Sequence, residues 1–271
     1  MLPLGFALAA LIGVSLGLLG GGGSILTVPV LVYVLGFGAK PAIAMSLPIV
    51  GITSLAGTLL HWRLGNVRLR TAIPFALLAM TGAYAGARLA VLMSGATQLV
   101  LLAVVMLAAA ASMLRGRRAG TSDSATAESP SRLVLLVPAA IAVGLLTGVV
   151  GIGGGFLVVP ALVLLARVPM RQAVGTSLFV IALNSVAGFA GYLGTVPIDW
   201  AFLAGFTTVA IAGAFAGTAL VRVVPAATLK RGFGVFLIAV GAFVLYMNRG
   251  ALAGATSSAT GARTSRLAAA R

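Results

Sequence analysis

Long apolar stretches recur along the chain and are separated by short polar segments. They run roughly over residues 2–19, 25–35, 42–62, 72–93, 99–114, 133–150, 156–166, 173–193, 200–221 and 233–246. Because a helix needs about 20 residues to cross the hydrocarbon of a bilayer, six of these stretches are long enough to span it. The two that follow glycine clusters, 25–35 and 156–166, are too short. The pattern predicts an all-α polytopic membrane protein.

An internal repeat divides the chain. A shift of 131 residues aligns residues 9–89 with 140–220 without a gap and gives 24 identities in 81 pairs. The matches include Gly13/Gly144, Gly17/Gly148, Gly20/Gly151, Gly22/Gly153, Gly23/Gly154, Pro29/Pro160, Gly57/Gly188, Gly82/Gly213 and Gly86/Gly217. The polar composition after each half marks a linker and a tail. We predict a first transmembrane repeat over 1–114, a linker over 115–131, a second repeat over 132–248 and a disordered tail over 249–271.

Charges in the connecting segments indicate how the halves are oriented. Segment 63–70 holds three arginines, whereas its counterpart holds Asp199; the uncharged segment 92–97 corresponds to one with Lys230 and Arg231. Loop cations set orientation and favour the cytoplasm. The alternation predicts inverted repeats with a cytoplasmic linker, each repeat a glycine-broken re-entrant hairpin plus three transmembrane helices. If the broken element crosses the bilayer once, the repeats are parallel, and this alternative stays open.

Each half contains a glycine cluster followed by a proline: GLLGGGGSILTVPVL over 17–31 and GVVGIGGGFLVVPAL over 148–162. Glycines in a helix interior cost about 1 kcal/mol each, and proline removes a donor. Free amides at the start of a half-helix form an anion site. We predict that both hairpin tips approach the bilayer midplane and hold an anion between them. The candidate residues are Gly20, Gly22, Gly23, Ser24, Gly151, Gly153, Gly154 and Gly155, with Ser46, Ser54, Ser177 and Asn184 in the following helices.

Other glycines are spaced by four residues, such as Gly13 and Gly17, and their spacing favours helix packing over binding. The single histidine, His61, stands beside Trp62 at a predicted helix end, where we expect both in the interfacial belt. No Asp or Glu falls within a predicted helix, so a carboxylate proton relay is not expected.

Composition excludes several classes of function. The chain has 271 residues, of which 61% are hydrophobic and 8% charged, and a water-soluble enzyme is incompatible with that mix. The net charge of +15 does not indicate nucleic-acid binding, because the cations lie between apolar stretches instead of forming one basic face. Cysteine is absent, and no metal-ligand cluster or P-loop occurs, so we expect no metal and no cofactor.

The doubled glycine motif resembles that of the sulfite exporter TauE/SafE family of bacterial permeases, also called the toluene sulfonate uptake permease family. The likeness covers nearly the whole chain; the first copy has Gly21 and Ser24 where the second has Ile152 and Gly155. The resemblance implies a multi-pass protein of the bacterial inner membrane that moves sulfite, organosulfonates or related anions.

The leading hypothesis is therefore a transporter for small sulfur-containing anions, in which the two halves rock about the hairpin tips. A passive anion channel shares these features, and a membrane-embedded hydrolase is a further alternative that would need His61 as its base. The expected partners are a small anion and the lipid bilayer. The direction of transport, coupling to a proton or sodium gradient and assembly into a homo-oligomer stay open.

Overall fold

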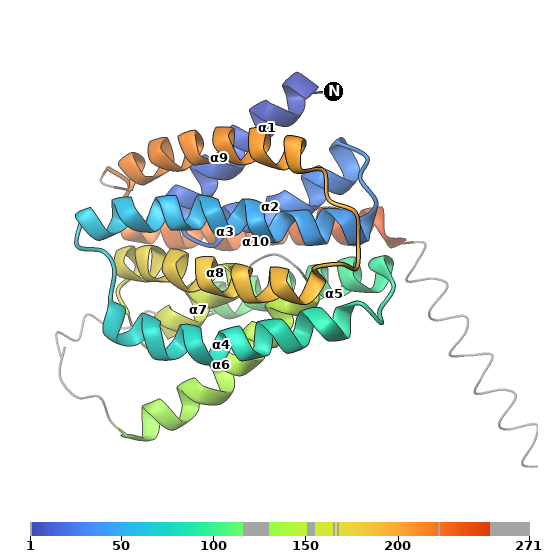
Figure 1. Cartoon of the computed structure of the whole chain (residues 1–271). Coiled ribbons are helices and arrows are strands. Elements are labelled where there is room, and N and C mark those ends of the chain that lie inside the picture. The colour runs from blue at the N-terminus through green and yellow to red at the C-terminus, as the bar shows by residue number, and fades with distance from the viewer. Residues whose placement is uncertain are drawn as a thin grey trace, which may run out of the picture.

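A computed structural model describes residues 2–115, 130–150, 155–164, 166, 168–221 and 223–249 (Figure 1). The described residues form helices and no strand. The elements are α1 (Leu2–Leu19), α2 (Gly22–Pro29), the π-helical segment η1 (Val30–Val34), α3 (Ala39–Arg63), α4 (Leu69–Ala90), α5 (Gly95–Arg115), α6 (Pro130–Val150), α7 (Gly155–Leu164), α8 (Met170–Tyr192), α9 (Trp200–Leu220) and α10 (Ala226–Met247). The predicted linker and tail fall almost wholly outside the described residues.

The all-helical membrane architecture predicted from the sequence is confirmed. Among the described residues, α3, α4, α8 and α9 are long and apolar enough to cross a bilayer. The described apolar parts of α1, α5, α6 and α10 are shorter than a full span, so four helices meet the criterion instead of the six predicted stretches. Large apolar side chains such as Leu59, Leu77 and Val186 are about three-fifths exposed, as lipid-facing side chains are.

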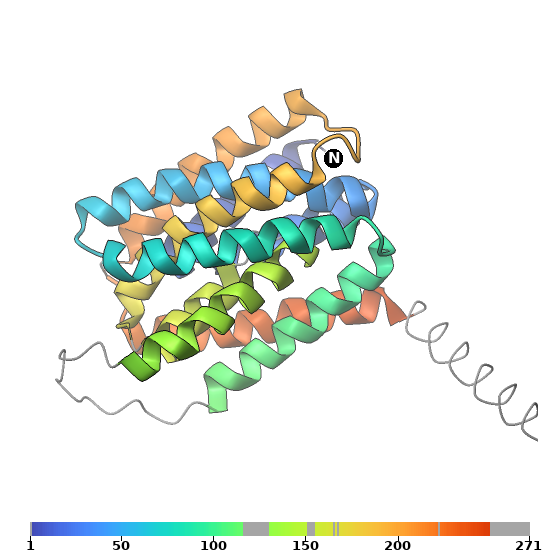
Figure 2. The same cartoon turned by 60° about the horizontal axis from the view of Figure 1, so that its bottom comes forward.

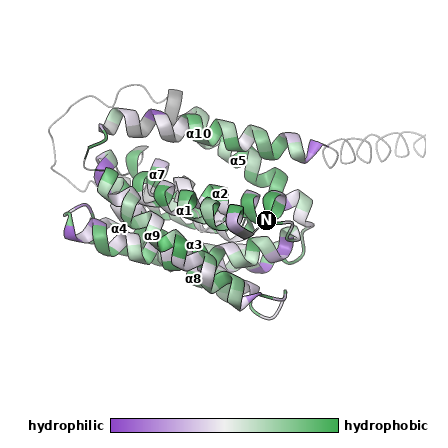
Figure 3. Ribbon diagram, turned by 90° about the horizontal axis from the view of Figure 1, so that it is seen from above, coloured by the Kyte–Doolittle hydropathy of each residue, from purple (hydrophilic) through white to green (hydrophobic). Residues whose placement is uncertain are grey.

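The helices form three layers. Viewed from above, α5 and α10 lie on one side, α3, α4, α8 and α9 lie on the other, and α1, α2 and α7 lie between them (Figure 3). Apolar residues cover the length of the helices, and hydrophilic residues gather at the two ends of the molecule. The short helices are well buried in this sandwich: Ile25 and Val28 of α2 and Val159 of α7 are inaccessible and share a core with Leu102 of α5 and Val244 of α10.

The central helices α3 and α8 run in opposite directions. Gly57 contacts Leu178, and Gly188 contacts Leu47, so residue numbers rise along α3 as they fall along α8. Figure 1 shows the same reversal in colour, since α3 runs from blue at the right to cyan at the left and α8 from yellow at the left to orange at the right. The two contacts are equivalent, because a shift of 131 residues converts one pair into the other.

The outer helices are paired across the two halves. Helix α1 packs on α9, and α4 packs on α6, the latter pair side by side in both Figures 1 and 2. A methyl group added to Gly13 would stand 1.9 Å from the Ala210 carbonyl oxygen, and one added to Gly144 would stand 2.0 Å from that of Ala79. The glycines spaced by four therefore bring helix backbones into contact, as predicted, and each contact recurs with the halves exchanged.

Glycine is required where these backbones meet, so Gly13→Ala should lower the free energy of unfolding by about 1–3 kcal/mol, the usual cost of overpacking. Gly232 of α10 is the matched control because nothing lies within 4 Å of a methyl group placed there. Alanine is also the better helix former by about 1 kcal/mol, so Gly232→Ala should leave stability unchanged or raised. Thermal unfolding of the purified protein in detergent measures both. Equal midpoints for the two variants would contradict the packing.

Candidate functional site

The first glycine cluster is a break at which the chain reverses direction. Gly20 has a φ of 72°, a left-handed conformation that favours glycine, and its amide donates to the Leu16 carbonyl at 2.8 Å. Helix α2 then returns along α1, since a methyl group on Gly23 would lie 2.2 Å from the Ile12 carbonyl oxygen. We call residues 20–24 the first hairpin tip. All five are buried.

The tip leaves backbone donors without helix partners. An α-helix offers no carbonyl to the amides of its first turn, which in α2 are those of Gly22, Gly23 and Ser24. The Ser24 hydroxyl does not cap them, because it donates to the Gly21 carbonyl at 2.7 Å. These amides and the positive end of the α2 dipole point back toward the end of the molecule at which α8 begins.

The tip packs against the start of α8. A methyl group on Gly20 would stand 2.6 Å from Ser177 Oγ and 3.0 Å from Val174 Cα. The structure thus brings together two of the predicted residues, Gly20 and Ser177, that are far apart in sequence. Ser177 lies in the second turn of α8, so Gly20 contacts α8 near its N-terminal end. The predicted approach of both tips to the bilayer midplane stays a prediction.

A polar band crosses α3 and α8 near their midpoints. Asn184 is inaccessible, and neither its Oδ1 nor its Nδ2 has a hydrogen-bond partner among the described residues. The Oγ atoms of Ser54 and Ser185 are also buried without partners. Ser46, by contrast, donates to the Ile43 carbonyl at 2.7 Å. Unpaired polar atoms at this depth are costly and call for a ligand or water.

The second cluster is only partly described. Gly151, Gly153 and Gly154 lie outside the described residues, and Gly155 is the first residue of α7. Local geometry after the two clusters is nevertheless alike. Leu35 donates from its amide to the Val30 carbonyl at 3.0 Å, and the equivalent amide of Ala166 donates to the Ala161 carbonyl at 3.3 Å. Both are hydrogen bonds between residues five apart, the π-helical pattern, and both occur after the proline of the short helix.

Sequence reasoning missed a pair of hydrogen bonds that hold the hairpins. His61 Nε2 donates to the Gly17 carbonyl at 3.0 Å, and the Tyr192 hydroxyl donates to the Gly148 carbonyl at 3.2 Å. Each acceptor lies in the last turn of its helix, where carbonyls lack intrahelical partners. His61 is fully buried, so its assignment to the interfacial belt was wrong, whereas Trp62 is half exposed. The signal was available, since His61 and Tyr192 are 131 residues apart.

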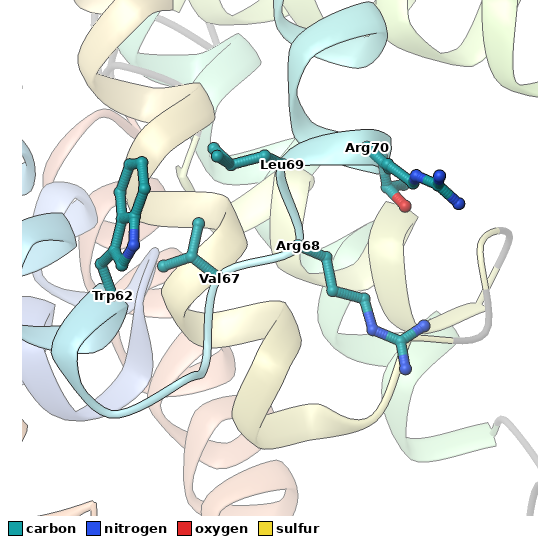
Figure 4. A pocket seen from close by; sticks show the side chains of 6 residues that line it. Trp62, Val67, Arg68, Leu69 and Arg70 are labelled. Atoms are coloured by element: carbon teal, nitrogen blue, oxygen red, sulfur yellow. The ribbon is translucent and has the colours of Figure 1, made fainter.

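Cavities open at the two ends of the molecule. One of about 460 Å³ is lined by Trp62, Val67, Arg68, Leu69, Arg70 and Thr71. In Figure 4 the Arg68 and Arg70 side chains extend away from Trp62. The Arg68 amide donates to Thr176 Oγ1 at 3.0 Å, which joins this basic cavity to the turn of α8 that contacts the tip. At the other end, a cavity of about 380 Å³ is lined by Phe37, Gly38, Pro41, Met45, Pro197, Ile198 and Asp199.

Within the described residues, no three His, Asp or Glu side chains are grouped to hold a metal ion. Near the tip, the hydroxyls of Ser24 and Ser177 and the N–H of His61 already donate to backbone carbonyls, so the first-turn amides of α2 are the available donors. Amides at the start of a helix suit an anion better than a cation.

The fold and these buried donors define a polytopic helical membrane protein with an interior polar site. The family model described as Sulfite exporter TauE/SafE matches residues 5–244. The chain belongs to this family of membrane transporters.

Relatives with curated names cover most of the chain. A "Probable membrane transporter protein" of Xylella fastidiosa strain 9a5c is 35% identical over 242 residues, 87% of this chain and 92% of the relative. The "Probable membrane transporter protein YdhB" of Bacillus subtilis is 28% identical over 81% of this chain and 90% of the relative. The "Probable membrane transporter protein MJ0441" of Methanocaldococcus jannaschii is 26% identical over 78% of this chain and 80% of the relative. No solved structure shows a significant match.

Two adjacent glycines of the tip should respond differently to substitution. Gly23→Ala places its methyl group 2.2 Å from backbone oxygen, so we expect a loss of about 1–3 kcal/mol in the free energy of unfolding. Gly22→Ala meets the side chain of Leu19, at 2.8 Å from Cδ1 and 2.9 Å from Cβ, and no atom of a neighbouring backbone. Its effect should be smaller than that of Gly23→Ala. Thermal unfolding in detergent separates the variants. A larger loss for Gly22→Ala would show that the hairpin is packed differently.

Proposed function

We propose that the protein transports small sulfur-containing anions, such as sulfite or organosulfonates, by alternating access across a bacterial inner membrane. The observation that carries the proposal is the buried first hairpin tip, in which Gly20 packs against Ser177 and the first-turn amides of α2 point toward the end of the molecule that carries the basic cavity. The description of the family supports sulfite as one substrate. The names of the relatives support transport rather than catalysis.

The two halves are inverted repeats in this proposal. It is supported by the antiparallel course of α3 and α8 and by contacts that recur with the halves exchanged, such as those of Gly13 and Gly144. Helices α1 and α2 then form a hairpin that enters and leaves on one side. Together α2 and η1 cover 13 residues, or roughly 20 Å, which is too short to cross the hydrocarbon. Duplicated, inverted halves are a common architecture among secondary transporters.

The end of the molecule that carries the basic cavity is cytoplasmic. Arg63, Arg68 and Arg70 gather there, as do Arg115 at the end of α5 and Arg171 at the start of α8. The described charges of the opposite end are the cations Lys40, Arg88 and Arg249 and the acid Asp199. The side chain of Lys40 donates to the Val91 carbonyl at 3.0 Å. The positive-inside rule assigns the arginine-rich end to the cytoplasm. The linker that joins α5 to α6 belongs to the same side.

Anion binding uses dipoles instead of a buried cation. Amides of Gly22, Gly23 and Ser24 supply hydrogen-bond donors at the positive end of α2. The Ser177 hydroxyl, which donates to the Val174 carbonyl at 2.8 Å, adds a donor when it exchanges that bond for one to the anion. Arg68 and Arg70 raise the local concentration of anions at the cytoplasmic mouth. Such a site can hold a sulfite or sulfonate group, whose oxygens accept several hydrogen bonds, without the cost of an unpaired charge when it is empty.

The polar band and the buried tip suggest how the anion moves. Asn184, Ser54 and Ser185 place unpaired polar atoms between the two ends, where a permeating anion can use them. Because the tip is buried, the structure corresponds to a closed conformation, and access requires movement of one half against the other. The equivalent hairpin of the second half would then receive the anion from the opposite side.

A reconstitution assay tests the proposal. Purified protein in proteoliposomes should take up radiolabelled sulfite or a radiolabelled sulfonate, and an imposed gradient should drive accumulation above the external concentration. Uptake that only equilibrates would favour a passive channel, and an absence of uptake of both probes would refute the proposed function. Empty liposomes provide the baseline.

Asn184→Leu should separate stability from transport. Leucine removes two unpaired polar groups from the interior, so the free energy of unfolding should stay unchanged or rise by about 1–3 kcal/mol. Anion uptake should fall by about tenfold or more, the effect of roughly 1.4 kcal/mol of lost binding. Thr53→Val is the matched control: Thr53 is the repeat equivalent of Asn184, and its hydroxyl donates to the Ile49 carbonyl of its own helix. A stable Asn184→Leu protein with normal uptake would remove Asn184 from the path.

A further inference from the structure

The single histidine occupies a position that the proposed function does not use. His61 is fully buried near the cytoplasmic end of α3, and its Cβ stands 3.0 Å from where a methyl group on Gly175 would lie. The flanking residues Val174 and Ser177 contact Gly20 of the tip. The imidazole and the tip therefore pack against the same turn of α8.

The hydrogen bond of His61 defines which nitrogen is free. The Gly17 carbonyl can only accept, so Nε2 carries the proton and donates it at 3.0 Å. Nδ1 has no hydrogen-bond partner among the described residues. A second proton can be added at Nδ1 without breaking the bond to Gly17. The resulting imidazolium would stand at the negative, C-terminal end of α1, where a cation is favoured.

Among the described residues, no acidic side chain is available to balance that charge. The chain has three acids: Asp123 and Glu128 lie outside the described residues, and Asp199 is at the opposite end, where it caps α9. Helices α1 and α9 contain no titratable side chain. Nearby charges on the other elements are cations: Arg63 on α3, Arg68 in the following loop, and Arg171 on α8, whose guanidinium donates to the Val224 carbonyl at 3.4 Å.

An unpaired charge is expensive to bury, so an empty site favours the neutral imidazole. An anion bound at the tip would supply the missing counter-charge. From this juxtaposition we infer that His61 binds a proton at Nδ1 together with the anion, which makes the protein a proton–anion symporter. The inference rests on the proposed function and specifies its coupling ion. Because linkage is reciprocal, the proton strengthens anion binding as much as the anion strengthens proton binding.

The second half supplies a natural template for the test. Tyr192, the repeat equivalent of His61, donates the same type of hydrogen bond to Gly148 but cannot become a cation. His61→Tyr should therefore keep a donor for the Gly17 carbonyl and lose the proton site. His61→Gln is a smaller second variant with the same property, which guards against misfolding of the larger tyrosine. Tyr192→Phe is the control, because it removes the equivalent bond from the other half.

The experiment measures accumulation driven by a pH gradient in proteoliposomes. The probe is radiolabelled methanesulfonate, or sulfite if the wild type moves only sulfite. The variants and the wild type are compared at the same pH gradient, so any change in the protonation of the probe affects all of them equally. With the exterior acidic by one pH unit, a monovalent anion that moves with one proton can accumulate up to about tenfold. We expect this accumulation in the wild type and in Tyr192→Phe. In His61→Tyr and His61→Gln it should fall to a ratio of about one, while probe-for-probe exchange at equal pH persists in at least one variant.

The outcomes separate the inference from the proposed function. If the wild type moves neither probe, the proposed function fails. If the wild type moves a probe but does not respond to the pH gradient, or if both His61 variants accumulate it normally, the coupling role fails alone. Loss of exchange in both folded variants would also overturn it, because His61 would then belong to the anion site or to the fold.

Discussion

The structure depends on close approach between helix backbones. Lipid is as apolar as a leucine side chain, so burial of apolar surface does little to hold helices together within a bilayer; packing contacts must do so. Here glycines bring α1 against α9 and α4 against α6, with methyl-to-carbonyl distances near 2 Å at Gly13 and Gly144. Each of these pairs joins one half to the other, so the two halves depend on the same packing contacts. The pairing also fixes the depth at which α1 ends.

The hairpin tip follows from that constraint. Irregular backbone is tolerated in a membrane only where protein or water covers it. Helix α2 contacts α10 on one side and α3 on the other, and the glycines of the tip are buried. They are therefore shielded from lipid. The orphan carbonyl of Gly17 is satisfied by His61. The first-turn amides of α2 and the polar band of α3 and α8 stay without protein partners. The proposed binding and release of an anion would account for that cost.

The sequence predicted the features that depend on local chemistry. The four adjacent glycines indicated a helix break, and α1 ends at Leu19 while α2 begins at Gly22 within the cluster. Spacing by four residues correctly marked Gly13 and Gly17 as packing positions. Features that depend on tertiary contact were not predicted. His61 looks interfacial beside Trp62, and only the end of α1, brought from 44 residues away, makes it a buried donor. The turn of α8 that contacts Gly20 was not predictable either, since no local pattern indicates how α1 and α8 are aligned.

The central claim is that the two halves face opposite sides of the membrane. Leu92 and Val223 are repeat equivalents in the loops that follow α4 and α9, and they are 82% and 78% exposed. Helices α4 and α9 end at opposite ends of the molecule (Figure 1). The chain has no cysteine, so Leu92→Cys and Val223→Cys each give a single labelling site. In intact cells, a membrane-impermeant maleimide should label the first variant and not the second, which should react only after permeabilisation. Labelling of both variants from the same side would contradict inverted repeats.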